Sequence, residues 1–160
     1  MIITELRGIP LEFDTNSKVF SPSDIDLGTL SMLAEFSPKS TDKILDLGCG
    51  YGIVGIFASK LIGPENVVMC DISEDAIELS KSNAIKNSVS EVLIIKSNGF
   101  DEIDGNDFTF ILSNPPYHAD FSVPKNFIEK GYKKLIIGGK MLMVTKRKDW
   151  YKNKLTTVFG

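Results

Sequence analysis

Residues 43–52, with the sequence Lys-Ile-Leu-Asp-Leu-Gly-Cys-Gly-Tyr-Gly, join a short apolar run to a loop that contains three glycines. The run 43–47 is typical of a buried strand, and apolar residues at helical spacing follow the loop over 53–62. Glycines let the backbone turn sharply and approach a ligand where a Cβ would clash. A strand, a glycine turn and a helix in this order predict a parallel α/β sheet with a ligand site at the carboxyl end of the strand.

The same alternation continues along the chain. Further strands are predicted at 66–71, 92–95, 108–112 and 141–144, and helices at 30–36, 73–87, from Pro124 to a stop at Gly138-Gly139, and at 150–158. The strands are apolar throughout, which indicates a sheet covered on both faces. The first twenty residues alternate weakly around Arg7-Gly8 and predict a short β-hairpin. We expect a Rossmann-like, doubly wound, mostly parallel α/β fold, with an N-terminal β extension at 1–22 and one domain at 23–160.

Length and composition place the chain among soluble single-domain proteins. It has 160 residues, of which 42% are hydrophobic and 24% charged. No apolar run approaches the roughly 20 residues of a membrane span, and the start lacks a basic signal-peptide region. Cys49 and Cys70 lie at apolar strand ends, which favours a reduced, cytoplasmic protein. One histidine and two separated cysteines make a metal site improbable.

The net charge of −3 hides an asymmetry between the two ends of the chain. Residues 121–160 hold 10 Lys and Arg against 2 acids, a charge of +8, whereas residues 1–120 hold 8 against 19, a charge of −11. A basic end on an acidic protein is a footprint for a polyanion such as RNA. The alternative is a solvated, lysine-rich helix face.

A second motif, Asn114-Pro115-Pro116-Tyr117, follows the predicted strand at 108–112. Asn114 offers a side-chain carbonyl, and Pro115 offers a backbone carbonyl. Two acceptors beside an aromatic plane suit a flat amino group that donates two hydrogen bonds, with Tyr117 stacked on the target. The alternative is a rigid turn with a core tyrosine.

Two acids at successive strand ends bear on the choice of cofactor. Residues 50–55 match G-x-G-x-x-G, which alone is a weak dinucleotide signal. Asp71 ends the second strand, where a carboxylate can accept both hydroxyls of a ribose. Asp46 stands just before the first glycine, where it would repel a pyrophosphate but attract a cation. This pair favours S-adenosylmethionine over NAD, and the remaining alternative is a glycine turn that binds nothing.

Together the motifs resemble class I S-adenosylmethionine-dependent methyltransferases. Asp46-x-Gly48-x-Gly50-x-Gly52 is similar to their cofactor-binding motif, and residues 114–117 are similar to the catalytic motif of the amino-methyltransferases. Upstream, Val19-Phe20-Ser21 and Asp26-Leu27-Gly28-Thr29 resemble the lead-in of the small-subunit ribosomal RNA guanine-N2 methyltransferases. The resemblance covers nearly all of the chain from about Gly8. It implies methyl transfer to an exocyclic nitrogen, most specifically guanine N2 of ribosomal RNA.

The resemblance also implies roles for single residues. Asp46 would hold the methionine ammonium, and the turn of Gly48, Cys49 and Gly50 would lie against the cofactor. Asp71 would bind the ribose hydroxyls, and Ile72 would pack on the adenine. Asn98, with Gly99, would contact the adenine amino group. The catalytic group would be Asn114, Pro115, Pro116 and Tyr117, with Asn114 also contacting the cofactor. Many relatives have Asp at the position of Asn98. His118 is expected to make a structural or substrate-edge hydrogen bond, and residues 146–152 to contact RNA.

Two departures from the family pattern leave alternatives open. Bacterial relatives often carry a second, degenerate copy of the domain, and the family sheet normally ends in an antiparallel hairpin that is absent up to Gly160. We therefore expect a partner, an oligomer or further chain to cover the edge of the strand at 141–144. The substrate is alternatively a protein glutamine or a DNA adenine. A non-catalytic binding module and an NAD oxidoreductase are the less favoured readings.

Overall fold

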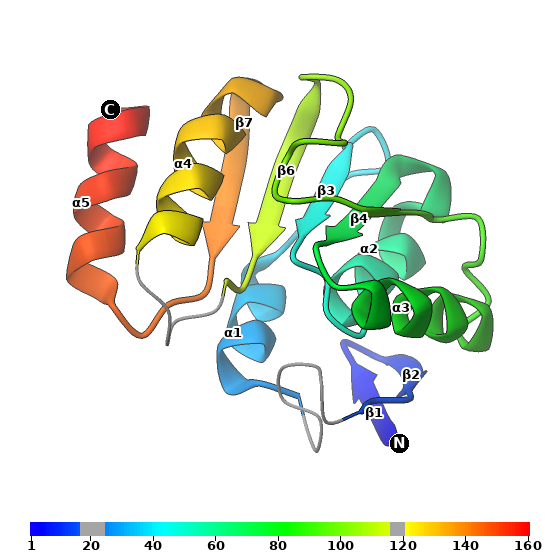
Figure 1. Cartoon of the computed structure of the whole chain (residues 1–160). Helices are drawn as coiled ribbons and strands as arrows, with labels where there is room; N and C mark the ends of the chain where they lie inside the picture. Colours follow the sequence, from blue (N-terminus) through cyan, green and yellow to red (C-terminus); the bar gives the residue numbers. More distant parts are fainter. Residues whose placement is uncertain (17–24, 116–120) are drawn as a thin grey trace.

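The computed structural model describes residues 1–16, 25–115 and 121–160. Its centre is a parallel sheet in the order β5-β4-β3-β6-β7 (Figure 1). The strands are β3 (Ile44–Leu47), β4 (Val67–Asp71), β5 (Leu93–Lys96), β6 (Phe108–Ser113) and β7 (Leu135–Met143). The chain runs outward from β3 to β5 and then returns to build β6 and β7 on the other side of β3. The carboxyl ends of β3 and β6 therefore flank the topological switch point, which confirms the predicted doubly wound fold.

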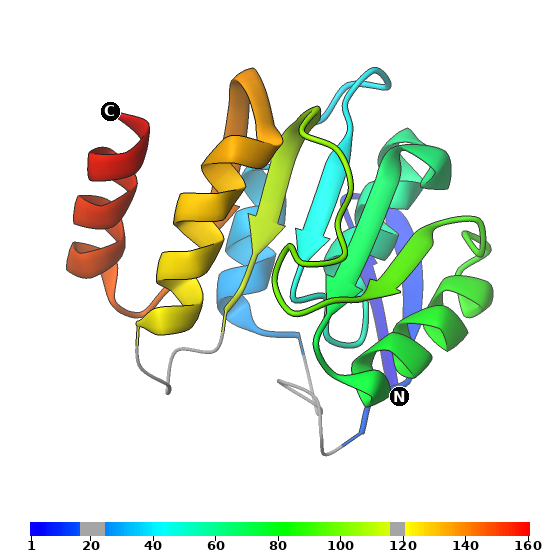
Figure 2. The same ribbon diagram turned by 45° about the horizontal axis from the view of Figure 1, so that its top comes forward.

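Helices cover both faces of the sheet, as the turned view in Figure 2 shows. The helices are α1 (Leu27–Glu35), α2 (Ile53–Ile62), the short 3-10 helix η1 (Pro64–Asn66), α3 (Glu74–Lys86), α4 (Ser122–Lys134) and α5 (Lys148–Phe159). Side chains of α1, α2 and α3 share one buried cluster, and Phe127 of α4 belongs to a second. None of the helices in the described ranges has both the length and the apolar character that a membrane span needs.

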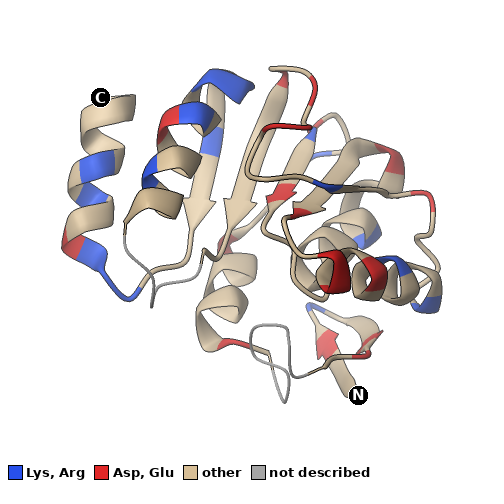
Figure 3. Ribbon diagram, in the orientation of Figure 1, with Lys and Arg blue, Asp and Glu red and all other residues tan. Residues whose placement is uncertain are grey.

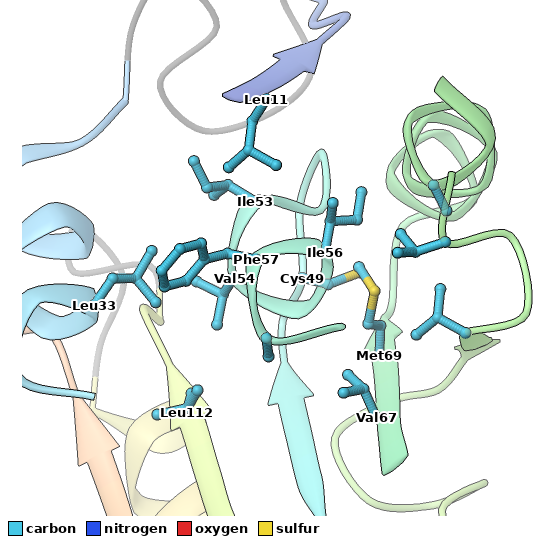
Figure 4. Close-up of a cluster of buried hydrophobic side chains, with 14 of the residues drawn as sticks. Leu11, Leu33, Cys49, Ile53, Val54, Ile56, Phe57, Val67, Met69 and Leu112 are labelled. Atoms are coloured by element: carbon cyan, nitrogen blue, oxygen red, sulfur yellow. The ribbon is translucent and has the colours of Figure 1, made fainter. Parts of the chain in front are cut away.

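The strand β3 shows how the two clusters divide. Ile44 enters the cluster that α1 and α2 cover, whereas Leu45 and Leu47 enter the cluster under α4. Successive side chains of a strand point to opposite faces, so both faces of β3 are apolar and buried. Figure 4 shows the first cluster, in which Phe57 of α2 lies close to Leu33 of α1.

An antiparallel hairpin precedes the sheet, as predicted. It consists of β1 (Ile2–Leu6) and β2 (Ile9–Phe13), joined by two residues with positive φ, Arg7 at 51° and Gly8 at 83°. Two positive φ angles are the signature of the hairpin turn whose twist matches the strands.

Asn83 of α3 and Asn87, which directly follows that helix, hold the hairpin. Asn87 Oδ1 accepts from the Glu12 amide at 3.0 Å, and Asn87 Nδ2 donates to the Glu12 carbonyl at 2.7 Å. Asn83 pairs in the same way with Asp14, at 2.8 and 2.9 Å. Asn83 Nδ2 also donates to the Tyr51 carbonyl at 2.8 Å. One side chain therefore ties the hairpin to the glycine turn.

The prediction that Gly138-Gly139 ends the fourth long helix is wrong. α4 ends at Lys134, and both glycines lie inside β7. The residues between them and the helix, Leu135 to Ile137, are apolar and mostly β-branched, which favours a strand. The pairing with β6 jumps from Phe108–Leu135 to Phe110–Lys140, so the glycines form a bulge, with φ of 85° at Gly138.

The carboxyl end of the chain packs on α4. Lys154 of α5 forms an ion pair with Glu129 at 2.7 Å. Near the start of α5, Trp150 stacks on Phe121, with ring centroids 4.4 Å apart, and the Arg147 guanidinium lies 4.9 Å from the Phe121 centroid. Phe121 is the residue just before α4, so this stack joins the beginnings of the two helices.

Candidate functional site

The turn after β3 presents its backbone to open space. Gly48, Gly50 and Gly52 all have positive φ, at 77°, 56° and 105°. The Gly48 and Cys49 amides both donate to the Cys70 carbonyl, at 2.9 and 2.8 Å, which fixes the turn against β4. A Cβ at Gly48 or Gly50 would meet nothing within 4 Å. These two glycines are therefore required by backbone conformation, and the space beside them is free for a ligand.

Asp46 is buried beneath this turn. It lies on β3 between Met69 and Leu112 of the neighbouring strands, and only 2% of its surface is exposed. Its Oδ2 accepts from the Gly55 amide at 2.8 Å. The helix α2 has no side-chain cap at Gly52, so Asp46 satisfies one of its free amides instead. A Cβ at Gly55 would lie 2.3 Å from Met69 Cγ, which explains the glycine there.

Burial changes the acidity of Asp46. Desolvation raises the pKa of this carboxyl from 3.8 to about 7, and the nearby charge of Asp71 adds to the rise, while the hydrogen bond from Gly55 opposes it. A cation in the adjoining cavity would favour the ionised form. The predicted contact with a ligand ammonium therefore fits the chemistry of this residue.

Asp71 connects the glycine turn to α3. Its Oδ2 accepts from the Gly50 amide and its Oδ1 from the Ser73 amide, both at 2.9 Å. Ser73 in turn caps α3. Each carboxylate oxygen retains a further lone pair, so the side chain can still accept hydroxyls of a ribose.

Asn114 lies at the end of β6 with its amide anchored to α1. Its Nδ2 donates to Asp26 Oδ2 at 3.2 Å and to Thr29 Oγ1 at 3.0 Å. Both amide hydrogens are used by these acceptors, so the carbonyl Oδ1 is left to accept from a substrate. Pro115 is buried beside it. The other predicted motif residues, Pro116 and Tyr117, lie outside the described residues, as do His118 and Val19-Phe20-Ser21.

One cavity brings five of the predicted site residues together. It is lined by Asp46, Gly48, Cys49, Gly50 and Asn114. We call this part the closed end of the site. Sequence reasoning gave no site role to the other lining residues, which are Asp26, Thr29, Tyr51, Ile53 and Val54.

The predicted cofactor residues Asp71, Ile72, Asn98 and Gly99 do not line that cavity, and we call the part of the site that they form the open end. Ile72 is 61% exposed, and Asn98 is exposed as well. The Ser97 amide donates to the Asp71 carbonyl at 2.9 Å, which brings the segment with Asn98 and Gly99 to the end of β4. An extended ligand could thus run from the cavity across Asp71 to Asn98.

The sequence contains a partial signal for Asp26 and Thr29, the two lining residues that contact Asn114. Asp26 caps α1 by accepting from the Thr29 amide at 3.1 Å. An acidic residue just before a helix commonly accepts from the backbone amide three residues later, so this contact could be expected from the sequence. The contact of the same carboxylate with Asn114, 88 residues away, has no local signature.

Neither cysteine is a reactive thiol, although Cys49 lines the cavity. Both thiols are free and buried. Burial raises the pKa of Cys49 well above its usual value and that of Cys70 to about 12, so neither forms a reactive thiolate. Within the described ranges, no three His, Cys, Asp or Glu side chains gather in a way that could hold a metal ion.

Comparisons with known proteins agree with this geometry. Residues 10–160 match the model of the methyltransferase small domain. The Bacillus subtilis (strain 168) protein YbxB is 34% identical over 146 residues, which cover 90% of this chain and 73% of YbxB. Ribosomal RNA small subunit methyltransferase C of Cronobacter sakazakii is 32% identical over 94% of this chain and 44% of its own length.

Among solved structures, the Thermus thermophilus 16S rRNA N2 methyltransferase RsmC, in complex with AdoMet and guanosine, superposes with a TM-score of 0.87 at 19% identity. The match covers 98% of this chain and 44% of that protein. The chain thus spans less than half the length of these methyltransferase C relatives.

Proposed function

We propose that this chain, which belongs to the methyltransferase small domain family, transfers a methyl group to an exocyclic amino nitrogen, most specifically guanine N2 of ribosomal RNA. Its cofactor is S-adenosylmethionine. The observation that carries the proposal is the position of Asn114, whose Nδ2 is held by Asp26 and Thr29 and which lines the same cavity as Asp46 and the glycine turn.

The residues at both ends of the site fit this cofactor. Asp46 would hold the methionine ammonium at the closed end, Asp71 would accept the ribose hydroxyls, and Ile72 would pack on the adenine. When bound, the cofactor supplies a methyl group activated by a positive sulfur. The Asp46 carboxylate, placed just before the glycine turn, would repel the pyrophosphate of a dinucleotide in its ionised form, which argues against NAD.

The protein's part in the reaction is to align and to stabilise charge. The Asn114 Oδ1 and the Pro115 carbonyl would accept the two hydrogens of the target amine and hold its nitrogen in line with the methyl group. These acceptors also stabilise the positive charge that develops on that nitrogen during transfer. Asn114 cannot take a proton at neutral pH, so the proton leaves afterwards to water.

Ribosomal RNA is the substrate that the relatives support. The Cronobacter relative is named a ribosomal RNA small subunit methyltransferase, and the Thermus structure contains guanosine. Both names belong to proteins that are longer than this chain. The identity of the methylated nitrogen and of the nucleotide that carries it is therefore part of our proposal. A cytoplasmic location remains a prediction that follows from this substrate.

The basic residues of 121–160 are spread over α4, β7, α5 and the segment between β7 and α5 (Figure 3), and the predicted RNA contact can be narrowed to those nearest the turn of Asn114. Lys146, Arg147 and Lys148 follow β7 at its carboxyl end, and the Val144 amide donates to the Ser113 carbonyl at 2.9 Å, so this group adjoins the turn of Asn114. Lys130, Lys133 and Lys134 lie near the other end of α4, and Lys140 lies within β7. We assign RNA contact at the site to 146–148, through the phosphates.

The free edge of β7 remains the predicted place for a partner, a second copy or further chain. β7 is the last strand of the sheet, and Ile136 and Ile137 are exposed on it.

Transfer of tritiated methyl from S-adenosylmethionine to unmodified small-subunit ribosomal RNA tests the proposed function. The variant Asn114→Ala should lose about 10²–10³-fold in kcat/KM, the size expected when one preorganised polar contact is removed. Its affinity for S-adenosylhomocysteine, measured by calorimetry, should stay close to that of the wild type, because the change affects the transition state.

Two results would contradict the proposal. One is equal methylation of RNA by the wild type and Asn114→Ala. The other is transfer only to protein or to DNA adenine, which would keep the enzyme but replace the substrate.

A further inference from the structure

We propose that Asp26 and Thr29 are positioning residues that orient the Asn114 amide, so that its oxygen faces the substrate. The inference rests on the proposed role of Asn114 as an acceptor. It adds two residues of α1 that have no assigned role and that act through Asn114.

The contacts have ordinary hydrogen-bond lengths, and of the three residues Thr29 is buried whereas Asp26 and Asn114 are half-buried. Thr29 is 5% exposed, and its Oγ1 lies 3.0 Å from Asn114 Nδ2. Asp26 Oδ2 accepts twice, from the Thr29 amide at 3.1 Å and from Asn114 Nδ2 at 3.2 Å. The same carboxylate therefore caps the helix and binds the amide.

A carboxylate at this place selects one of the two orientations of an amide. The oxygen and nitrogen ends of an Asn side chain have almost the same shape, so packing alone distinguishes them poorly. Asp26 is an acceptor when ionised, so it attracts the Asn114 nitrogen and repels the oxygen. The reversed amide would bring two acceptors together and would offer the substrate a donor instead of an acceptor.

The first turn of α1 is itself held firmly against the sheet. A Cβ at Gly28 would lie 2.3 Å from Val144 Cγ1, so the backbone of α1 closely approaches the segment after β7. The Val144 amide donates to the carbonyl of Ser113, which directly precedes Asn114. The helix start and the turn of Asn114 therefore share one rigid support.

This arrangement predicts that residue 114 must be an amide in this protein. In Asn114→Asp, the new carboxylate would face the carboxylate of Asp26, and the two would repel each other. In the paired exchange Asp26→Asn with Asn114→Asp, an amide at 26 can again donate to an acceptor at 114. Since Asp26 Oδ2 binds both partners, the amide nitrogen that takes its place no longer accepts from the Thr29 amide, so the exchange weakens the helix cap while it restores the contact with residue 114.

Kinetics with S-adenosylmethionine and unmodified small-subunit ribosomal RNA test the proposal. Thr29→Val should lower kcat about tenfold with KM little changed, which corresponds to one lost hydrogen bond of about 1.4 kcal/mol. Thr29→Ser keeps the hydroxyl and should restore most of the activity. Thr157→Val, on the exposed face of α5, is the matched control and should behave as wild type.

The paired exchange of residues 26 and 114 is the more decisive test. Asn114→Asp alone should lose about 100-fold in kcat/KM, and the double variant should recover at least about tenfold of that loss. An unchanged kcat in Thr29→Val, or a double variant no better than Asn114→Asp, would overturn the proposal.

A measurement without substrate separates this proposal from the proposed function. In ¹⁵N-labelled protein, the side-chain amide protons of Asn114 should exchange slowly with solvent, and about tenfold faster in Thr29→Val than in Thr29→Ser. Fast exchange in the wild type would overturn the positioning role even if methyl transfer is observed. Slow exchange in the wild type, together with an activity of Asn114→Ala equal to that of the wild type, would instead contradict the role of Asn114 and thus the proposed function.

Discussion

The closed and open ends of the site are built in different ways. At the closed end, Asp46 and Asn114 are held by residues from other elements, and the partners of Asn114 are 85 and 88 residues away. At the open end, Asp71 finds its partners within a few residues or in the adjacent turn, and Ile72 contacts mostly solvent. The comparison indicates that the proposed reacting groups are placed by contacts between distant segments, whereas the proposed adenosine contacts are placed mainly by the strand ends and the adjacent turn.

The largest difference in unfolding free energy is expected between substitutions of Gly55, which binds Asp46 of the closed end, and of Gly99 at the open end. Gly55→Ala should lower the free energy of unfolding by about 2–3 kcal/mol, because the new Cβ would lie 2.3 Å from the buried Met69. Gly99→Ala, at the open end, should cost only about 1–2 kcal/mol, the strain of a positive φ. Urea unfolding of both variants measures this. A larger loss for Gly99→Ala would reverse the comparison.

The pH dependence of the free energy of unfolding should come mainly from Asp46, at the closed end of the site. The folded protein holds a proton on Asp46 up to a pKa of about 7, against 3.8 when unfolded, so folding takes up a proton between these values. The stability that this proton uptake gives is present at low pH and is lost as pH rises through about 7. Between pH 5 and 8 the cofactor-free protein should lose about 2–3 kcal/mol.

Unfolding curves at several pH values check this loss. Asp46→Asn should flatten the profile over this range and Asp71→Asn should retain most of it, since Asp71 is the smallest of the stated causes. An unchanged slope in Asp46→Asn would place the titrating group elsewhere.

Asp71→Asn should affect binding and stability together. An amide has one acceptor oxygen where the carboxylate has two, so either Gly50 or Ser73 loses the partner of its amide. We expect a loss of about 2 kcal/mol in unfolding free energy and about tenfold weaker binding of S-adenosylhomocysteine by calorimetry. The exposed Asp104→Asn is the control and should change neither quantity.

The smallest effect is expected at Ile72. Ile72→Ser should leave stability within about 0.5 kcal/mol, because the side chain is 61% exposed. It should weaken S-adenosylhomocysteine binding about threefold to tenfold through lost apolar contact. Ile85→Ser on α3, 69% exposed, should change neither. Equal affinities of the two variants would remove Ile72 from the adenine contact.

The order of strands and helices could be predicted because hydrophobic periodicity and glycine or proline signals are local. The turn at 48–52 and the cap at Ser73 lie where these signals place them. Gly138-Gly139 was misplaced because a glycine pair ends a helix and bulges a strand with equal ease, and the choice depends on pairing with β6.

The roles of the site residues stay a prediction, and the structure adds contacts among them that the sequence does not indicate. The sequence indicates Asp46 and Asn114, but not that Asp26 and Thr29 meet Asn114, since the hydrogen bonds join segments that only the folded sheet brings together. That Lys146, Arg147 and Lys148 adjoin the turn of Asn114 likewise depends on the pairing of the segment after β7 with the end of β6.

The stack of Trp150 on Phe121 has a practical consequence. Trp150 is the single tryptophan of the chain, and its ring faces a residue that lies between the turn of Asn114 and α4. The indole therefore acts as a built-in fluorophore at the rim where a nucleic acid would arrive. Its emission can follow docking in real time without any dye attached to the protein.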